Sequence, residues 1–554
     1  MPPAERGTDP ALSVVTAAPP TPNGDLHLGH LSGPYAAADI YTRARRLTGH
    51  DAVYLTGSDL HQSYVPVKAR ANGVDPYRMA DDYADDIARV FAAIGFAPDA
   101  CPRPARDRRH RDMVIEFIAT LHARGALLPR TGDGLHCGRC DRYLFEAYVS
   151  GGCPHCTADS DGNSCEACAQ PNTCVDLVDP VCNVCGTPPT RRPYRRLVFP
   201  LHRYADSLRA YHARTVMSPQ LEALCATMLA APLPEIPLTH PTDWGIASPV
   251  AGFTDQRVYV WAEMVPGYLA ALAEALAARG GGDWRAVWDA PESEVVQFFG
   301  FDNGYFHTIL FPALLMAYDP AIRLPDALLT NEFLHLDDGK FSTSRGHAIW
   351  ARELLDRVPA SAVRFALAHD RPETGPSSFT LDRFRTLVDH ELAGRWQSWL
   401  DSLADRVPLT GVLPLDDPLP SHRRFLADLA DMARQCLVVY SAARFSPRTA
   451  TRVLVDIVRR ATEFAAGQSR LRTFGPSATL DAAVAAETAA ARTLAQLAWP
   501  VMPEFAEHLW HALGETGSPR WDGVHPVAPG RRLTRTSPFF RPLPAGLEQS
   551  VWPG

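Results

Sequence analysis

The chain has 554 residues, of which 46% are hydrophobic and 21% charged, and its formal net charge at pH 7 is −8. This length is too great for one hydrophobic core, so several domains are expected, and the composition is that of an ordinary globular protein. The negative charge excludes a chain-wide attraction to nucleic acid, so an RNA partner requires a local basic patch.

The N-terminal residues lack the pattern of a secretory signal, and no apolar run reaches the roughly 20 residues of a membrane helix. We therefore expect a cytoplasmic protein with no membrane partner. In that compartment cysteines are reduced, and closely spaced pairs of them are typical of metal ligands.

The first predicted elements are a strand, a turn, a helix and a second strand. Residues 13–18 (SVVTAA) read as a short buried strand, PPTPNG follows as a turn, and a helical pattern runs from about His27 to Leu47. Residues 51–56 form the next predicted strand, and 75–125 show the apolar spacing of helices. A strand, a helix and a strand in succession indicate a Rossmann-type, doubly wound parallel sheet.

The composition changes abruptly after this region. Nine of the twelve cysteines lie between Cys137 and Cys185, amid glycine, aspartate and asparagine. Strand-like runs resume at Val258–Trp261 and at Val295–Phe299. The sequence therefore predicts a sheet domain that is interrupted by a cysteine-rich insertion.

The C-terminal part has a different character. From about Phe384 to Leu513 nearly every segment is an amphipathic helix, and the residues after Trp521 are proline-rich and expected to be irregular. The predicted fold class is α/β: a Rossmann-type parallel sheet split by a zinc-knuckle insertion and followed by an all-α helical bundle.

The tetrapeptide His27-Leu28-Gly29-His30 lies where the first turn enters a helix. Free backbone N–H groups and the helix dipole favour an anion there, and two histidines three residues apart can both donate to phosphate oxygens. Gly29 leaves room for a flat base near the backbone. Two histidines on a helix are usually unremarkable, but this position after a strand and a Pro-Asn-Gly turn favours a functional role.

A second polar segment spans residues 337–346 (DDGKFSTSRG). Lys340, Ser342, Ser344 and Arg345 form a loop that could hold a triphosphate. Alone, it would read as a solvated basic loop.

The cysteines form four CxxC pairs, which suit two tetrahedral, closed and structural Zn²⁺ sites. Cys174 is left over, and Cys101, Cys225 and Cys436 are predicted to be core thiols. The eight predicted zinc ligands are Cys137, Cys140, Cys153, Cys156, Cys165, Cys168, Cys182 and Cys185.

Together these features resemble the paired ATP signatures of class I aminoacyl-tRNA synthetases, the HIGH and KMSKS motifs. The resemblance is closest to the methionyl-tRNA synthetase family and extends from about Ala18 to at least Trp510. It rests on the ordered segments APPTPNGDLHLGH, YVWAEMVPGY, FFGFDNGYFH and KFSTSRG, together with the cysteine knuckles.

The resemblance implies a domain order and a pairing of the knuckles. The two inner CxxC pairs would share one zinc ion and the two outer pairs the other. The expected domains are 1–120, first half of the catalytic domain; 121–240, the insertion with its knuckles at 137–185; 241–330, the second half; 331–380, the KMSKS-type loop and a stem-contact-like region; 381–525, an anticodon-binding-like helical domain; and 526–554, an irregular tail.

The resemblance also implies residue roles for an ATP-dependent, aminoacyl-adenylate-forming ligase that uses Mg²⁺. His27, His30 and Lys340 would be catalytic, mainly by placing positive charge on the α-phosphate and the departing pyrophosphate. The expected ATP-binding residues are Asn23, Gly24, Gly29, Gly300, Asp302, Ser342, Thr343 and Ser344. The expected amino-acid-binding residues are Ala18, Thr21, Asp59 for the α-ammonium group, Trp261, Met264, Tyr268, Asn303 and His307.

Several positions depart from the family pattern. Thr21 replaces a tyrosine of the family, Met264 replaces a small residue and Asn303 replaces an apolar residue. We therefore expect a pocket for a polar side chain, because an apolar ligand would leave the buried amide of Asn303 unpaired at a cost of roughly 1–3 kcal/mol. Neighbouring residues could instead refill a methionine site. Thr343 replaces the second lysine of the KMSKS motif. His240, next to Thr239, stands where the family has an arginine.

The helical domain departs further. The asparagine and arginine that read the anticodon in the family fall at Ser398 and Ser402, and a stacking tryptophan falls at Leu471. Without these residues the chain lacks the stacking and hydrogen-bonding side chains that usually recognise single-stranded RNA. Arg470, Arg472 and Trp399 are the nearby residues that could substitute.

Three functions remain open from the sequence. The first is a tRNA-independent paralogue in natural-product biosynthesis, which would pass a polar amino acid to a small-molecule acceptor, with a separate cupin-type partner if an N–N bond or hydrazine is made. The second is a genuine methionine–tRNA ligase. The third is a non-catalytic binding protein, against which the intact His27, His30, Asp59 and Asp302 speak. A monomer or weak dimer is expected.

Overall fold

The computed structural model describes residues 12–162, 164–341, 347–416, 418–469, 477–534 and 538–551. The chain divides into two compact units. Unit 1 comprises Met1–Asp25, Val53–Arg89 and Pro98–Asn331, and unit 2 comprises Leu26–Ala52, Val90–Ala97 and Glu332–Gly554. Among the described residues, no helix combines the length and apolar character needed to cross a membrane.

The main sheet has four strands in the order β13-β12-β1-β2. Its strands are β1 (Leu12–Ala17), β2 (Asp51–Leu55), β12 (Glu294–Gly300) and β13 (Ala327–Asn331). The β1–β12 and β12–β13 pairs are parallel, with Ser13 opposite Glu294 and Val296 opposite Ala327. All six residues of β1 are buried, as expected for a continuous apolar strand of a parallel sheet. The predicted parallel sheet is therefore confirmed.

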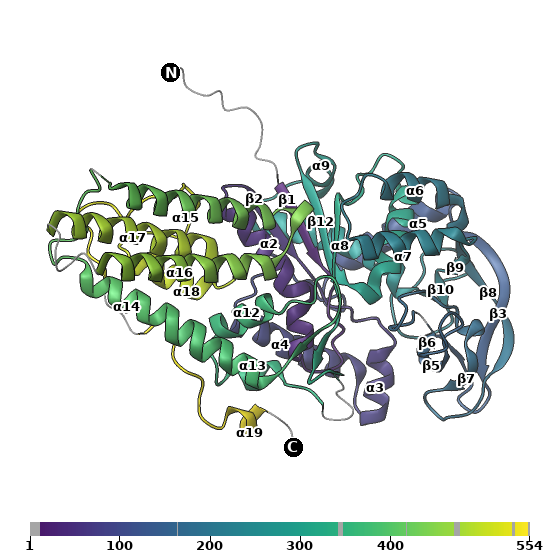
Figure 1. Ribbon diagram of the computed structural model, residues 1–554. Helices are drawn as coiled ribbons and strands as arrows, with labels where there is room; N and C mark the ends of the chain where they lie inside the picture. The colour runs from purple at the N-terminus through teal and green to yellow at the C-terminus, as the bar shows by residue number, and fades with distance from the viewer. Residues whose placement is uncertain are drawn as a thin grey trace. The chain divides into compact units, whose positions relative to one another are not determined.

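Helices α5 and α8 pack against each other beside this sheet (Figure 1), and α10 contacts both of them in the core of unit 1. The helices of unit 1 are α3 (Tyr64–Asn72), α5 (Arg108–Ala123), α6 (Ala205–His212), α7 (Pro219–Ala230), α8 (Val260–Ala278), α9 (Trp284–Asp289) and α10 (Phe311–Tyr318). Helix α4 (Pro76–Ile94) passes from unit 1 into unit 2.

The insertion consists of two small antiparallel sheets with strand orders β4-β3-β8-β9 and β6-β5-β7. The long pair β3–β8 carries the chain out to the knuckles and back. The strands are β3 (Leu128–Cys137), β4 (Arg142–Leu144), β5 (Glu146–Gly152), β6 (Asp159–Gly162), β7 (Val178–Cys182), β8 (Thr190–Pro200) and β9 (Glu235–Pro237); β10 (Thr239–His240) and β11 (Arg257–Val258) form a further pair.

Unit 2 begins with a helical stretch that changes its winding. It comprises α1 (Leu28–His30), a π-helical turn (Leu31–Tyr35) and α2 (Ala36–Leu47). A small sheet of β14 (Leu334–Leu336), β15 (Gly339–Lys340) and β16 (Ser377–Phe379) follows later in the chain.

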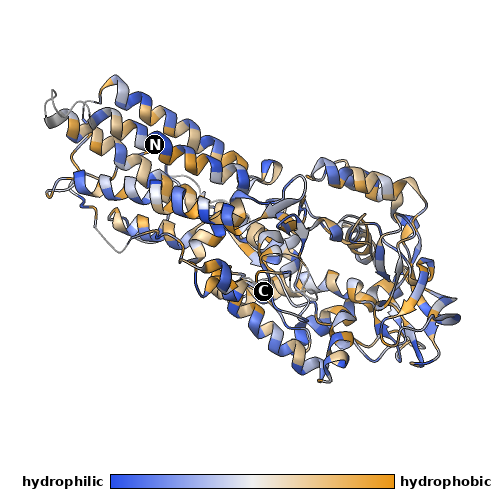
Figure 2. Ribbon diagram, turned by 60° about the horizontal axis from the view of Figure 1, so that its bottom comes forward, coloured by the Kyte–Doolittle hydropathy of each residue, from blue (hydrophilic) through white to orange (hydrophobic). Residues whose placement is uncertain are grey.

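The remainder of unit 2 is helical, as predicted. Its long helices lie side by side as a bundle (Figure 1), and their ribbons carry apolar and polar segments in alternation, with the apolar positions buried (Figure 2). The helices are α11 (Ala351–Leu355), α12 (Ala360–His369), α13 (Leu381–Thr386), a π-helical segment (Leu387–Trp396), α14 (Gln397–Arg406), α15 (Pro420–Val439), α16 (Pro447–Ser469), α17 (Ser477–Ala498), α18 (Pro503–Ala512) and α19 (Leu547–Val551).

Three predictions about local structure are wrong. The tail over residues 526–554 is not entirely irregular, because Leu547–Val551 form the short helix α19. Val258–Trp261 is not a strand, because only Arg257–Val258 is extended and helix α8 begins at Val260. The residues of α8 are buried on every side of the helix, so its sequence lacks the apolar periodicity that would have indicated a helix. Cys101 is exposed rather than a core thiol, because it lies in the irregular segment after Ala100. Cys225 and Cys436 are buried, as expected.

Candidate functional site

In unit 2 the two histidines of the HLGH segment stack on each other, with ring centroids 3.8 Å apart. The His27 backbone forms an isolated β-bridge with Trp350, and Leu28 N donates to Ile349 O at 3.1 Å. On its other side the His27 ring stacks on Phe341, the residue after Lys340. The structure therefore brings the two signature segments together within one unit.

Gly29 is required by this packing. A Cβ at this position would lie 2.9 Å from His27 Cε1 and 3.2 Å from Phe341 Cδ2, so any side chain would push one ring away. In the structure the rings of His27 and Phe341 lie on this side of Gly29, and the predicted approach of a base to its backbone stays a prediction.

The environment of His27 disfavours its charged form, and its predicted role in stabilising the phosphates stays a prediction. Burial, and then the neighbouring His30, lower the pKa of His27 to about 2, so its imidazole is neutral at pH 7. A neutral ring can donate a hydrogen bond to a phosphate oxygen but adds no net charge. Lys340, the other predicted source of positive charge, is exposed on β15, with its ammonium group 5.1 Å from the centroid of the Phe333 ring.

Some predicted ATP-binding residues lie outside the described residues. These are Ser342, Thr343 and Ser344, together with the neighbouring Arg345. Their predicted roles stay predictions.

In unit 1, Asp59 lies just after β2 and has one carboxylate oxygen available. Its Oδ2 accepts a hydrogen bond from Thr21 Oγ1 at 3.4 Å, and the Gln62 side chain also hydrogen-bonds to the carboxyl group. Its Oδ1 is buried and has no partner among the described residues. Burial, and the nearby charges of Glu146 and Glu263, hold the pKa of Asp59 well above its usual range. A bound cation would satisfy the free oxygen and restore the ionised form.

The predicted aromatic residues of the pocket are buried in unit 1. Trp261 packs against Tyr305 and Phe306, with centroid distances of 5.9 and 5.6 Å. His307 stacks on Phe299 at 4.0 Å and its Nδ1 lies 3.1 Å from Gln297 Oε1. Burial lowers the pKa of His307 to about 3, so the ring is neutral.

Gly300, Asp302 and Asn303 form a second group at the end of β12. A side chain at Gly300 would collide with Asp302 Oδ1. Burial, and then the charge of Glu166, raise the pKa of Asp302 to about 6. The Asn303 amide hydrogen-bonds to the Asp302 side chain, so it already has a partner inside the protein.

The remaining predicted residues lie in the turn after β1. Ala18 N donates to Phe298 O at 2.9 Å and Asn23 N to Thr21 O at 2.9 Å. Gly24 lies beside the Lys68 ammonium group, which would be 3.4 Å from an added Cβ.

A buried cluster in unit 1 was missed from the sequence. Glu263 Oε1 lies 2.8 Å from His61 Nδ1 and 2.9 Å from His110 Nε2, and all three side chains are almost fully buried. The two histidines lie 202 and 153 residues from Glu263 in the chain, so only the position of Glu263 within YVWAEMVPGY could have drawn attention to it.

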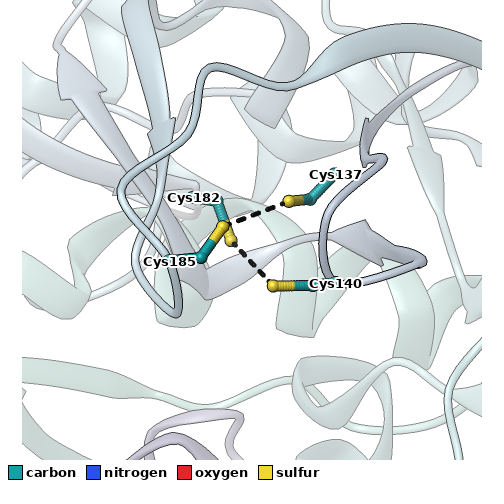
Figure 3. A group of neighbouring side chains, drawn as sticks. All are labelled: Cys137, Cys140, Cys182 and Cys185. Carbon is teal, nitrogen blue, oxygen red and sulfur yellow. Dashed lines mark hydrogen bonds between the residues drawn. The ribbon is translucent and has the colours of Figure 1, made fainter.

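The cysteines converge as two groups of four, in the pairing that the family resemblance implied. Cys137, Cys140, Cys182 and Cys185 form the outer group (Figure 3), and Cys153, Cys156, Cys165 and Cys168 the inner group.

Both groups fit a tetrahedral metal ion. Sulfur atoms lie 3.4 and 4.0 Å apart across two pairs of the outer group and 3.9 and 3.6 Å apart in the inner group. A tetrahedral Zn²⁺ ion with bonds of about 2.3 Å separates its sulfur ligands by about 3.8 Å. The donor sets therefore suit two structural zinc ions.

The positions that correspond to the family's anticodon-reading residues carry two serines on α14. Ser398 and Ser402 are exposed on α14, beside the exposed Asp401 and Asp405. Trp399 is only 3% exposed and its indole N–H donates to Glu487 at 2.8 Å, so it is unavailable for base stacking. The suggestion that Trp399 substitutes for the lost residues is wrong, while Leu471, Arg470 and Arg472 lie outside the described residues.

Comparison with known proteins gives a consistent family. The family "tRNA synthetases class I (M)" matches residues 13–403. The methionine–tRNA ligase of Flavobacterium johnsoniae is 32% identical over 83% of this chain and 65% of its own length. The methionine–tRNA ligase of Chlorobaculum tepidum is 30% identical over 92% of this chain and 76% of its own length. The chain therefore spans about two thirds to three quarters of these two relatives.

A solved structure shares the fold. Mycobacterium tuberculosis methionyl-tRNA synthetase in complex with methionyl-adenylate superposes with a TM-score of 0.79 and 22% sequence identity, covering 96% of this chain and 99% of that one. With stacked histidines and Phe341 in one unit, paired zinc knuckles in the other and a family match over residues 13–403, the chain belongs to the class I aminoacyl-tRNA synthetases of the methionyl type.

Proposed function

We propose that this chain activates an amino acid with ATP, forms an aminoacyl-adenylate and transfers the acyl group to an acceptor. The observation that carries the proposal is that Asp59 Oδ1 is buried with no partner among the residues the structure describes, since such an oxygen suits the α-ammonium group of an amino acid. The relatives favour methionine as the amino acid and tRNA as the acceptor, which makes a methionine–tRNA ligase the first candidate.

The residues of unit 2 would act on the phosphates. His27 and His30 would donate hydrogen bonds to oxygens of the α-phosphate, and Lys340 would supply the positive charge that stabilises departing pyrophosphate. Mg²⁺ is proposed as the partner of ATP, as for other enzymes that act on the phosphates of a nucleotide.

The residues of unit 1 would bind the rest of the substrates. Gly300 and Asp302 would bind adenosine, and Trp261, Tyr268 and His307 would enclose the amino-acid side chain. The two zinc ions would stabilise the insertion and take no part in the reaction.

The second candidate is a tRNA-independent paralogue that acts on a polar amino acid and a small-molecule acceptor. It is favoured by α14, where Ser398 and Ser402 lie beside Asp401 and Asp405, because exposed carboxylates repel a phosphate backbone. This candidate requires an acceptor-specific partner, such as a separate cupin-type protein. The cytoplasmic location, and a monomeric or weakly dimeric state, stay predictions.

ATP–pyrophosphate exchange followed by charging of methionine tRNA tests both candidates. Exchange with methionine and charging of the tRNA would establish the first. Exchange without charging would favour the second, and the acceptor would then be sought among hydroxyls, amines and hydroxylamines. If no amino acid supports exchange, activation itself is excluded.

A further inference from the structure

The helical stretch that follows the HLGH segment is broken at Gly33. This residue has a φ of −79° and a ψ of −137°, outside the helical range, and it lies in the π-helical turn between α1 and α2. Pro34 has no N–H group, so a carbonyl group one turn before it loses a helical donor. Ser32 Oγ donates to Gly29 O at 3.0 Å in the same turn. The place of the two signature histidines relative to α2 therefore depends on how this turn is held.

A buried arginine from a distant part of the sequence binds the backbone of this turn. Arg371 follows α12 and is 3% exposed, and its Nη1 donates to Ser32 O at 2.6 Å and to Gly33 O at 2.9 Å. Burial lowers the pKa of Arg371 to about 10, so its guanidinium group is charged at pH 7. Hydrogen bonds from a charged donor are stronger than those between neutral groups, and more so away from water. The turn is therefore bound by a permanent charge within unit 2.

The segment that carries Arg371 is itself anchored. Two residues further on, the Glu373 carboxylate is bonded through both oxygens at the start of α16. Its Oε2 accepts a hydrogen bond from Ser446 Oγ at 2.7 Å, and its Oε1 accepts one from Arg448 N at 2.9 Å. A side chain on a fixed segment holds its partners more rigidly than one on a free loop. Arg371 therefore connects the turn to the helical bundle.

We infer that Arg371 is a positioning residue, which fixes the turn through the carbonyl groups of Ser32 and Gly33. The turn in turn sets the place of His27 and His30 against the phosphates of the substrate. This inference rests on the proposed function, in which these histidines bind the α-phosphate. Loss of Arg371 should slow the chemical step and leave substrate binding in place, because a catalytic group displaced by about 1 Å costs up to about a hundredfold in rate.

Arg364 provides a matched control in the same unit. It is 5% exposed on α12, and it donates to Asp39 Oδ2 and to Val501 O, both at 2.6 Å. Asp39 belongs to α2, beyond the turn. The two arginines are therefore alike in burial and in chemistry, and they differ in whether they contact the turn.

Steady-state pyrophosphate exchange with methionine tests the role of Arg371. Arg371→Met should lower kcat by roughly ten- to a hundredfold and change the KM for ATP and for methionine by less than about threefold. Arg371→Lys keeps a charged donor and should recover part of this loss. The same two substitutions at Arg364 should lower the melting temperature and leave kcat within about threefold of the wild-type value.

Hydrogen–deuterium exchange measured by mass spectrometry gives a second readout that needs no activity. In Arg371→Lys, the peptides that cover residues 27–38 should lose protection, because their turn opens more often. In Arg364→Lys the loss should fall on the part of α2 beyond Asp39. Thermal unfolding of each variant shows that it is folded, and the lysine variants carry the test if a methionine variant is not.

The outcomes separate the inference from the proposed function. Unchanged kcat in the Arg371 variants, an equal loss of kcat in the Arg364 variants, or unchanged protection of residues 27–38 overturns the inference. A higher KM with an unchanged kcat also overturns it, since Arg371 would then act in binding. If the wild-type protein supports exchange with no amino acid, the proposed function fails, while the protection of residues 27–38 still decides whether Arg371 fixes the turn.

Discussion

The ring of Phe341 stacks on His27 with a centroid distance of 4.6 Å and an interplanar angle of 6°. Phe341 follows Lys340, so this stack ties the lysine-bearing segment to the histidine proposed to bind phosphate. Replacing the ring with the flexible Phe341→Leu should lower kcat for pyrophosphate exchange by about tenfold and leave the KM for the amino acid unchanged, since misplaced catalytic groups slow reaction.

A matched variant distinguishes positioning from stability. Phe384→Leu removes a buried ring of the same unit that packs on Phe379, away from His27. It should lower the melting temperature without lowering kcat. Equal loss of kcat in both variants would refute the positioning role of Phe341.

Asp59→Asn should raise the KM for the amino acid by roughly ten- to a hundredfold, because a charge-assisted hydrogen bond to the ammonium group is lost. The KM for ATP should change little. Thr21→Val removes only the 3.4 Å hydrogen bond to Oδ2 and should have a smaller effect. Steady-state exchange kinetics measure both, and an unchanged KM in Asp59→Asn would argue against ammonium binding there.

Metal analysis by mass spectrometry should find two zinc ions per chain. Cys165→Ser should lose the inner ion and Cys140→Ser the outer one, each leaving about one ion per chain. Cys174→Ser is the control, since its sulfur donates to Gly162 O and belongs to neither group, so it should keep both ions. Loss of zinc in the control would show that the assignment of ligands is wrong.

Glu146 predicts a pH dependence of stability. It is 2% exposed, its Oε1 has no partner among the described residues, and burial raises its pKa from 4.5 to about 7. The folded state therefore binds the proton more tightly than the unfolded state. Protonation of Glu146 therefore stabilises the folded state. Its contribution to the free energy of unfolding is fully present below pH 4.5 and is lost as the pH rises to about 7, and it amounts to about 3 kcal/mol at most.

The variant Glu146→Gln removes this titration. Its free energy of unfolding should be higher than that of the wild type at pH 8, and the difference should shrink as the pH falls towards 4.5. Urea unfolding at a series of pH values measures it. Parallel curves for the two proteins over this interval would contradict the assignment to Glu146.

Local patterns in the sequence predicted much of this structure. The buried strand of residues 13–18, the helix after the HLGH segment and the eight cysteines all carry their signal within a short window. Long-range partners carry no such signal. Trp399 hydrogen-bonds to Glu487, and His110 contacts Glu263 far away in the chain, so neither pairing could be derived from residues nearby.

The two zinc groups are nested, since the inner group spans Cys153–Cys168 and the outer group encloses it in Cys137–Cys185. The entropy lost on closing a loop grows with its length, and a loop already closed shortens the effective length of the one around it. If each group binds a zinc ion, closure of the inner group would therefore lower the entropic cost of closing the outer one. A chelator would then be expected to remove the outer ion first, while the inner knuckle stays closed.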